Sequence, residues 1–302
     1  MAEIILHHYD RSPFSEKVRV VLGWKGAAWR SVQIPRWMPK LDLMPLTGGY
    51  RKTPVMQIGA DIYCDTRIIL REIDRRFPEP PLFGSGAGGL AAAWADSAFF
   101  ITAVGVVFGT LGDNLPAELK EDRIKMTAGM FDAGRMKAQQ PAIRAQFRAS
   151  LATVEAVLAD GRSFLPGSAP DIGDFALYHT LWFVRGNIKE PDLFAGATRT
   201  VAWIERMAAK GHGRPTPLDS KEALAIAAAA TPEPVAGSSA VDFSGVKPGD
   251  KVTVAANDYG RDPVAGELLA IDDRRIVLRR RDATAGDLHL HFPRIGFDVS
   301  PA

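Results

Sequence analysis

The sequence predicts an α/β region, then an all-helical region, then a small antiparallel β region. Three observations support this order. Short β-type runs alternate with helical patterns in residues 1–83, and helical periodicity dominates residues 88–232. Short alternating segments, separated by turns that contain Asp, Gly and Pro, fill residues 241–302. Stretches rich in Pro and Gly lie between these ranges, so we expect three domains with these bounds.

The composition is that of an ordinary soluble protein. The 302 residues are 46% hydrophobic and 24% charged, and 37 basic against 35 acidic residues leave a formal charge of +2. This balance gives no general attraction to nucleic acid or to an anionic membrane, and we expect neither as a partner. Cys64 is the only cysteine and no signal-peptide pattern opens the chain, so we expect a cytoplasmic protein. The longest apolar run, residues 99–111, is too short to span a bilayer and predicts a buried helix.

The first region reads as a short series of strands and helices. We expect strands at residues 4–9 and 29–34, a hairpin formed by residues 55–58 and 62–64, and helices at residues 14–23 and 66–77. Ser12 before Pro13 is a typical helix start, because serine satisfies a free amide and proline has none to satisfy. The resulting order, β-α-β-(α)-β-β-α, is typical of a thioredoxin-like domain.

Residues 51–66, RKTPVMQIGADIYCDT, combine a proline, a hairpin and an acidic-hydroxyl pair at a helix start. The stretch resembles the glutathione-binding half of the glutathione S-transferases. In that family the proline is cis, the residue before it bonds the cysteinyl part of glutathione, and an acidic-Ser/Thr pair holds the γ-glutamyl group. The resemblance therefore implies that Thr53, Pro54, Asp65 and Thr66 bind glutathione. Asp-Thr departs from the more usual Glu/Gln-Ser, and the alternative is a turn proline and a helix cap without a ligand.

A second stretch, S-P-F-S-E-K-V-R from Ser12, is similar to the transferases that carry a catalytic serine or cysteine at this helix start. The resemblance implies that Ser12 activates the thiol of glutathione. Tyrosine-using classes have their hydroxyl at the position of His8, and Tyr9 is one residue out of register, on the opposite strand face. Tyr9 and Ser15 remain alternatives, and the non-catalytic alternative for Ser12 is a plain helix cap. The C-x-x-C of dithiol redox proteins is absent here, which excludes dithiol exchange.

The helical region has one clear landmark. G-R-S-F-L-P-G is followed by D-I-G-D, in which Asp171 can cap a helix and Asp174 can complete a capping box. The transferase family has the same structural landmark. The helix that follows, to about Arg185, is apolar nearly all round and hence central. We also expect a group of aromatic residues to be core, with one or two lining an acceptor pocket as the resemblance implies: Trp94, Phe99, Phe100 and Phe108.

The transferase resemblance covers roughly three-quarters of the chain and stops before the β region, for which an SH3-like barrel is our expectation. Two acidic residues precede and one follows a group of arginines, which predicts a solvated strand face and argues against a nucleic-acid stripe: Asp272, Asp273 and Asp282 flank Arg274, Arg275, Arg279, Arg280 and Arg281. His289 and His291 share a strand face but have no third ligand nearby, and we expect no metal. Cys64 is expected in the core. From the linker we further expect that a chain ending near Ala236 still folds and binds glutathione.

The resemblance as a whole implies a glutathione transferase. Glutathione would be the co-substrate, a small apolar electrophile the acceptor, and the protein a homodimer. The alternative is a non-catalytic binding or adaptor protein of the same fold, which uses its β region to recruit a partner.

Overall fold

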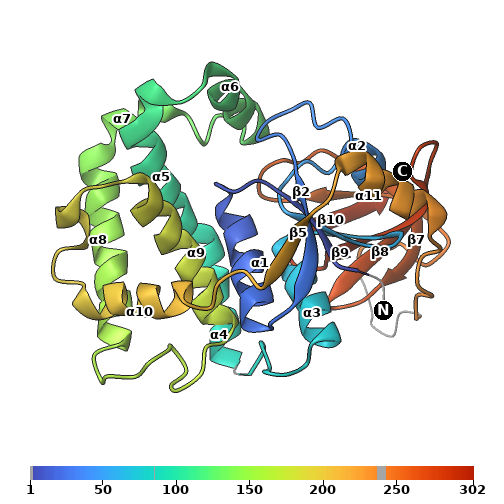
Figure 1. Cartoon of the computed structure of the whole chain (residues 1–302). Helices are drawn as coiled ribbons and strands as arrows, with labels where there is room; N and C mark the ends of the chain where they lie inside the picture. The colour runs from blue at the N-terminus through green and yellow to red at the C-terminus, as the bar shows by residue number, and fades with distance from the viewer. Residues whose placement is uncertain (1–2, 85, 237–242) are drawn as a thin grey trace. The chain divides into compact units, whose positions relative to one another are not determined.

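The computed structural model describes residues 3–84, 86–236 and 243–302 (Figure 1). Contacts divide the chain into two compact units. The first, here called the sheet unit, contains Met1–Val18, Ala27–Ile73 and Arg214–Ala302; the second, the helical unit, contains Arg19–Gly26 and Asp74–Gly213.

The N-terminal part of the sheet unit has the predicted thioredoxin-like order. Strand β1 pairs parallel with β2 and antiparallel with β3, which pairs antiparallel with β4. The element bounds are β1 (Ile5–His8), α1 (Pro13–Trp24), β2 (Ala28–Gln33), α2 (Met44–Thr47), β3 (Val55–Ile58), β4 (Asp61–Cys64) and α3 (Thr66–Arg76). A further strand, β5 (Arg214–Pro217), pairs parallel with β2 in a range that the sequence predicts to be helical. It lies at the sheet edge with exposed side chains, where its two prolines are tolerated.

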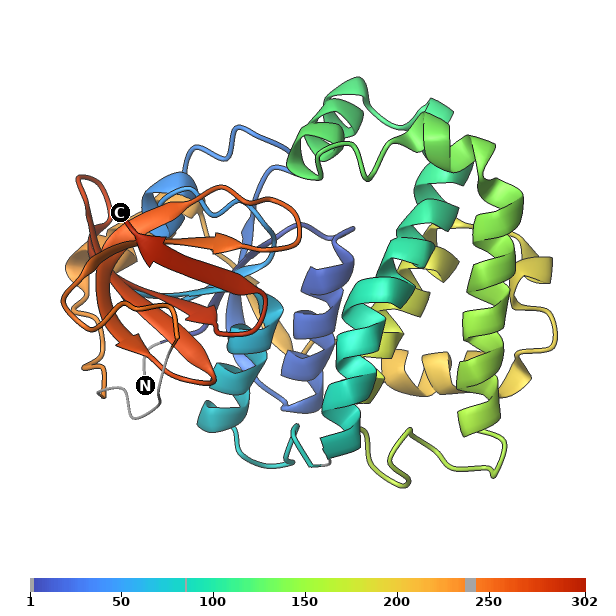
Figure 2. The same cartoon turned by 180° about the vertical axis from the view of Figure 1, so that it is seen from behind.

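The C-terminal part of the sheet unit is the predicted antiparallel β region. Its strands are β6 (Lys251–Ala256), β7 (Val264–Ile271), β8 (Arg275–Asp282), β9 (Gly286–Pro293) and β10 (Phe297–Pro301) (Figure 2). Strand β9 also pairs parallel with β4, in the register Asp61↔His289, Ile62↔Leu290 and Tyr63↔His291. The strands therefore form one sheet in the order β10-β6-β7-β8-β9-β4-β3-β1-β2-β5.

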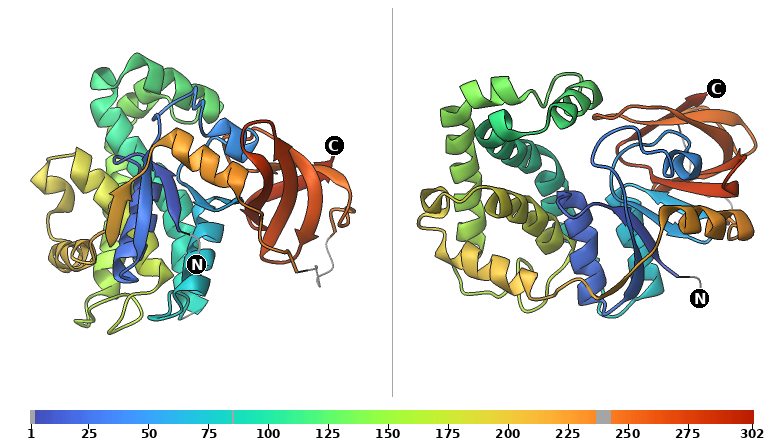
Figure 3. Two further views of the ribbon diagram at one scale, coloured as in Figure 1. Left: turned by 45° about the vertical axis from the view of Figure 1, so that its right-hand side comes forward. Right: turned by 45° about the horizontal axis from the view of Figure 1, so that its top comes forward.

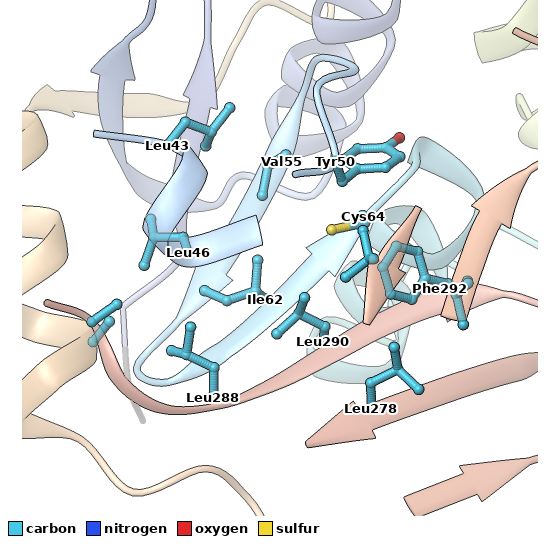
Figure 4. Packing of buried hydrophobic residues seen from close by; sticks show 14 of the residues in the cluster. Leu43, Leu46, Tyr50, Val55, Ile62, Cys64, Leu278, Leu288, Leu290 and Phe292 are labelled. Atoms are coloured by element: carbon cyan, nitrogen blue, oxygen red, sulfur yellow. The ribbon is translucent and has the colours of Figure 1, made fainter. Parts of the chain in front are cut away.

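One hydrophobic core serves both parts of this sheet. Ile62 and Cys64 of β4 pack in the same cluster as Leu288, Leu290 and Phe292 of β9 (Figure 4). Ala223, Leu224 and Ala227 of α11 (Ser220–Ala229) also belong to this cluster. Cys64 is fully buried, which confirms its predicted place in the core. The three domain ranges expected from the sequence remain a prediction, and the structure adds that the first and third of them share a core.

The helical unit is all-helical, as predicted (Figure 3). Its helices include α4 (Gly86–Trp94), the π-helix η1 (Ala95–Phe99), α5 (Phe100–Leu111), η2 (Gly112–Asn114), α6 (Ala117–Met126), α7 (Ala133–Ala138), α8 (Gln140–Val157), α9 (Ile172–Asn187), η3 (Pro191–Phe194) and α10 (Thr198–Ala208). Helix α9 is buried on almost every side, as its apolar sequence predicts. Asp171 and Asp174 form the predicted capping box at its start, and Asp174 Oδ1 also accepts the indole N–H of Trp203 at 2.8 Å.

The stretch Gly86–Asn114 runs as 29 residues of continuous helix and is longer than the apolar run noted in the sequence. By length and composition alone it could cross a membrane, and it is the one such helix in the part of the chain that the structure describes. Phe99 and Phe100 are buried, and Phe99 stacks on Phe147 of α8 with ring centroids 5.7 Å apart. The core helix of a soluble protein has these properties.

Candidate functional site

Three neighbouring strands, β1, β3 and β4, have ends that lie together, and the predicted site residues follow or precede these ends in the sequence. His7 of β1 lies opposite Val55 of β3, which lies opposite Cys64 of β4. Because both pairings are antiparallel, the end of β1, the start of β3 and the end of β4 coincide. The residues that extend from this row are Ser12, Thr53, Pro54, Asp65 and Thr66, and we call them the candidate site.

Ser12 forms the N-cap of α1. Its Oγ accepts a hydrogen bond from the Ser15 N–H at 3.2 Å, and its carbonyl accepts one from the Glu16 N–H at 2.9 Å. The residue is only 2% exposed. The cap occupies one acceptor position of the hydroxyl and leaves its proton for donation. The helix-cap alternative therefore describes this geometry, and the hydroxyl can still act as a donor.

The two alternatives to Ser12 differ in their surroundings. The Tyr9 carbonyl accepts the Ser12 N–H at 3.1 Å, and the Tyr9 side chain packs against the core of the sheet unit. Ser15 Oγ is buried and has no hydrogen-bond partner among the residues that the structure describes. His8 is buried, with Nε2 2.9 Å from Ser31 Oγ.

The Thr53–Pro54 peptide bond is cis, which confirms the prediction. A buried ammonium group lies beside it: Lys40 Nζ donates to Thr53 Oγ1 and to the Arg51 carbonyl, each at 2.8 Å. Sequence reasoning missed Lys40, because it stands in an irregular Pro-rich segment without a periodic pattern. Its contacts hold the residue before Pro54 in place.

Asp65 and Thr66 open α3. Asp65 Oδ1 accepts the Arg67 N–H at 2.8 Å, and the Asp65 carbonyl accepts the Ile69 N–H at 3.1 Å, so Asp65 is the helix cap. Its φ of 90° lies in a region that residues other than glycine rarely adopt. Such strained residues persist where their surroundings hold them and are concentrated at ligand sites. No sequence pattern predicted this backbone conformation.

His7 of β1, opposite Val55, is buried. Its Nε2 lies 2.9 Å from Gln57 Oε1, and the Gln57 amide donates to the Ala223 carbonyl of α11 at 2.9 Å. Burial lowers the pKa of His7 to about 4, against the opposing effect of the Gln57 hydrogen bond. His7 is therefore neutral at physiological pH and serves the packing of β1, β3 and α11.

The charged residues of the β region are mostly paired. Arg279 Nη2 lies 2.5 Å from Glu267 Oε1, and the half-buried Arg280 donates to the Pro45 carbonyl at 2.7 Å. His291 Nε2 lies 2.8 Å from Asp61 Oδ1. Within residues 3–84, 86–236 and 243–302, no group of three or more His, Cys, Asp or Glu side chains could hold a metal ion.

Two family models match the chain. Residues 6–81 match the N-terminal domain of glutathione S-transferases, and residues 137–206 match their C-terminal domain. The first match contains the whole candidate site.

Relatives fall into two groups by coverage. A crystal structure of a GST-like protein from Pseudomonas syringae is 40% identical, covers 99% of each chain and has a TM-score of 0.83. FtsZ-localized protein A from Caulobacter vibrioides is 25% identical over 236 residues, which are 75% of this chain and 96% of that protein. A glutathione S-transferase from Methylobacterium radiotolerans, in complex with glutathione sulfonate, is 20% identical with a TM-score of 0.52 and covers 72% of this chain and 97% of its own, which shows the fold alone. The Pseudomonas match thus extends over the β region as well.

Proposed function

Because the chain belongs to the glutathione S-transferase family, with an additional C-terminal β region, we propose that it is a glutathione transferase. It binds glutathione at the candidate site and joins the sulfur to a small apolar electrophile. The observation that carries the proposal is the convergence of Ser12, Thr53-Pro54 and Asp65-Thr66 at one end of three neighbouring strands.

Each residue has a distinct role in this proposal. The Thr53 backbone bonds the cysteinyl part of glutathione. Asp65 offers a carboxylate to the ammonium group of the γ-glutamyl part, and Thr66 offers a hydroxyl and the first-turn amides of α3. The positive end of α3 suits the α-carboxylate of the same group.

Ser12 activates the thiol. A free thiol with a pKa near 8.5 is only a few per cent thiolate at neutral pH, and lowering that pKa by about two units takes roughly 2.7 kcal/mol. The N-terminus of α1 supplies about 0.3 to 1 kcal/mol, and a hydroxyl that donates to the charged sulfur adds roughly 1.5 to 3 kcal/mol. A side-chain donor is therefore needed, and the buried Ser12 hydroxyl is the best placed one.

Two measurements test the proposal: calorimetric titration with glutathione, and turnover with a chlorodinitrobenzene as a generic electrophile. Asp65→Ala removes both the charge and the helix cap, whereas Asp65→Asn keeps a good cap and removes only the charge. We expect both variants to weaken glutathione binding by about tenfold, the value of one charged hydrogen bond. Wild-type affinity in Asp65→Asn would show that the carboxylate only caps α3.

The second candidate is a binding protein of the same fold. The similarity to FtsZ-localized protein A, whose name places it with FtsZ, favours this candidate. Turnover separates the two functions. A transferase consumes the electrophile and does so more slowly in Ser12→Ala, whereas an adaptor shows no turnover even when saturated with glutathione.

We also propose a cytoplasmic homodimer, because proteins of this family commonly form dimers. Light scattering coupled to size-exclusion chromatography tests the dimer, with twice the chain mass of 32.7 kDa as the expected result.

A further inference from the structure

A loop of the β region contacts Lys52, the residue before Thr53 of the candidate site. In the β6–β7 loop, residues 257–263, Asp258 Oδ1 lies 2.5 Å from Lys52 Nζ. The centroid of the Tyr259 ring lies 4.3 Å from the same nitrogen. Lys52 directly precedes Thr53. We propose that this loop is part of the glutathione site, where Asp258 competes with a ligand carboxylate for Lys52 and so sets the affinity for an anionic thiol. This inference rests on the proposed function.

Lys52 is more buried than its partner Asp258. The Lys52 side chain is only 12% exposed, whereas the Asp258 side chain is 53% exposed. The aromatic face of Tyr259 attracts the ammonium group and limits its movement. Lys52 is therefore held at the edge of the site while its partner carboxylate remains in contact with solvent.

The loop is ordered by its own hydrogen bonds. Arg261 Nη2 donates to the Asn257 carbonyl at 2.6 Å, and its Nε donates to the Asp258 carbonyl at 3.3 Å. The Asn257 N–H donates to the Gly296 carbonyl at 3.0 Å, which joins the loop to the β9–β10 turn. Asp258 is thus presented to Lys52 by a loop with internal support.

The β9–β10 turn approaches the other half of the site. Gly296 has φ +89°, and a Cβ there would lie 3.0 Å from Arg67 Nη1. The same Nη1 lies 3.9 Å from Asp65 Oδ2. Two joined segments of the β region therefore approach the side chains of Lys52, which precedes Thr53, and Arg67, which lies close to Asp65.

Tyr50, two residues before Lys52, packs against the β region. Its ring packs against Phe292 and Phe297, with centroids 6.0 and 6.2 Å away. Burial, followed by the charge of Asp65 and smaller effects that include Asp258, raises the pKa of the Tyr50 hydroxyl well above its usual value. Tyr50 therefore packs on β9 and β10 within electrostatic range of both carboxylates.

The sign of the effect follows from charge. At neutral pH glutathione has two carboxylates and one ammonium group, so it is a net anion. Asp258 neutralises Lys52 and repels that anion. Asn at this position keeps the shape and an oxygen acceptor for Lys52 but removes the charge, so affinity for the anion increases.

The test compares glutathione affinity of the full-length wild type and two single variants at low and high salt. We expect Asp258→Asn to bind glutathione about threefold more tightly at low salt, with the gain fading at high salt. Asp113→Asn is the matched control, because Asp113 Oδ2 also lies 2.5 Å from a lysine, Lys137 of the helical unit. It makes the same change in net charge, and we expect unchanged affinity.

A second variant removes the Lys52 ammonium group, for which Asp258 and the ligand carboxylate compete. Lys52→Met keeps the aliphatic stem and should weaken glutathione binding severalfold. Unchanged or weaker binding in Asp258→Asn, while the wild type binds glutathione, overturns this inference and leaves the proposed function standing. A wild type that binds no glutathione overturns both. Asp258→Ser removes the same charge with a smaller side chain and must give the same direction as Asp258→Asn.

Discussion

His291 Nε2 lies 2.8 Å from Asp61 Oδ1 and joins strand β9 of the β region to strand β4 of the thioredoxin-like part. Asp61 is 2% exposed, and its Oδ2 accepts the Glu233 N–H at 2.8 Å. The His291 ring stacks on Tyr63 with centroids 4.4 Å apart. A buried carboxylate is stable only when it is hydrogen-bonded. Both partners of Asp61, the His291 ring and the Glu233 N–H, follow the helical unit in the sequence. The polar contact thus supports the same junction as the apolar core.

Asp61→Ala should destabilise the protein by about 2 to 4 kcal/mol, because it leaves the buried His291 ring and the Glu233 amide without their acceptor. Urea denaturation followed by circular dichroism measures the change. Asp287→Ala is the control, since this carboxylate is 59% exposed and lies 3.8 Å from Arg281. Equal effects of the two variants would show that the Asp61 contact contributes little.

A chain that ends after Ala236 should be insoluble or aggregate. This expectation reverses our prediction from the linker sequence. Without β9, strand β4 has an open edge, and Ile62 and Cys64 lose the cover of Leu290 and Phe292. Open apolar edges pair with other chains. Soluble yield and size-exclusion chromatography measure the effect.

Co-expression of residues 243–302 as a separate chain is the control for this truncation. If the shared core is what the short chain lacks, the added chain should restore solubility. A short chain that is monodisperse and binds glutathione on its own would support the original linker prediction instead.

The sequence predicted the elements better than their long-range pairing. Local patterns placed the hairpin of β3 and β4 and the cap of α9 within a residue or two, because alternation and capping act over neighbouring positions. The pairing of Tyr63 with His291 has no local signal. Burial of all four residues of β4 indicates a strand covered on both faces, but the sequence pattern alone does not name its partner.

The site shows the same division. Ser12 and Asp65 were identified from short motifs, and both are helix caps in the structure. The contact of Lys52 with Asp258 joins residues 206 positions apart, and only the folded sheet brings them together. Strand β5 was missed because its prolines argue against a strand except at an edge. The ligand roles of the candidate site stay predictions.

His7 should make stability fall in mild acid. Burial lowers its pKa from 6.5 to about 4, so the unfolded chain binds a proton more readily than the folded one. The contribution of His7 to the free energy of unfolding is therefore fully present above pH ~6.5. It falls by roughly 3 kcal/mol as the pH decreases to ~4. Unfolding free energies measured across this range in wild type and in His7→Gln test the claim. The variant, which does not titrate, should show a flatter curve, and parallel curves would refute the assignment to His7.

Ser12→Ala should raise the pKa of bound glutathione by about one to two units and slow turnover at neutral pH, while affinity changes little. The reason is that the hydroxyl stabilises the charged sulfur and contributes little to binding of the neutral thiol. The loss of the α1 cap should also cost about 1 kcal/mol of stability. Titration of thiolate absorbance, with wild type and variant both saturated with glutathione, measures this pKa directly. The result does not depend on any loss of folding stability.

Ser15→Ala is the matched control, one turn along the same helix. Ser15 Oγ is buried and has no partner among the described residues, so its removal should leave the thiol pKa unchanged and make the fold slightly more stable. A pKa shift in Ser15→Ala but not in Ser12→Ala would transfer the donor role to Ser15. If neither variant shifts the thiol pKa, Ser12 is only a helix cap, and activation must come from Tyr9 or a backbone amide.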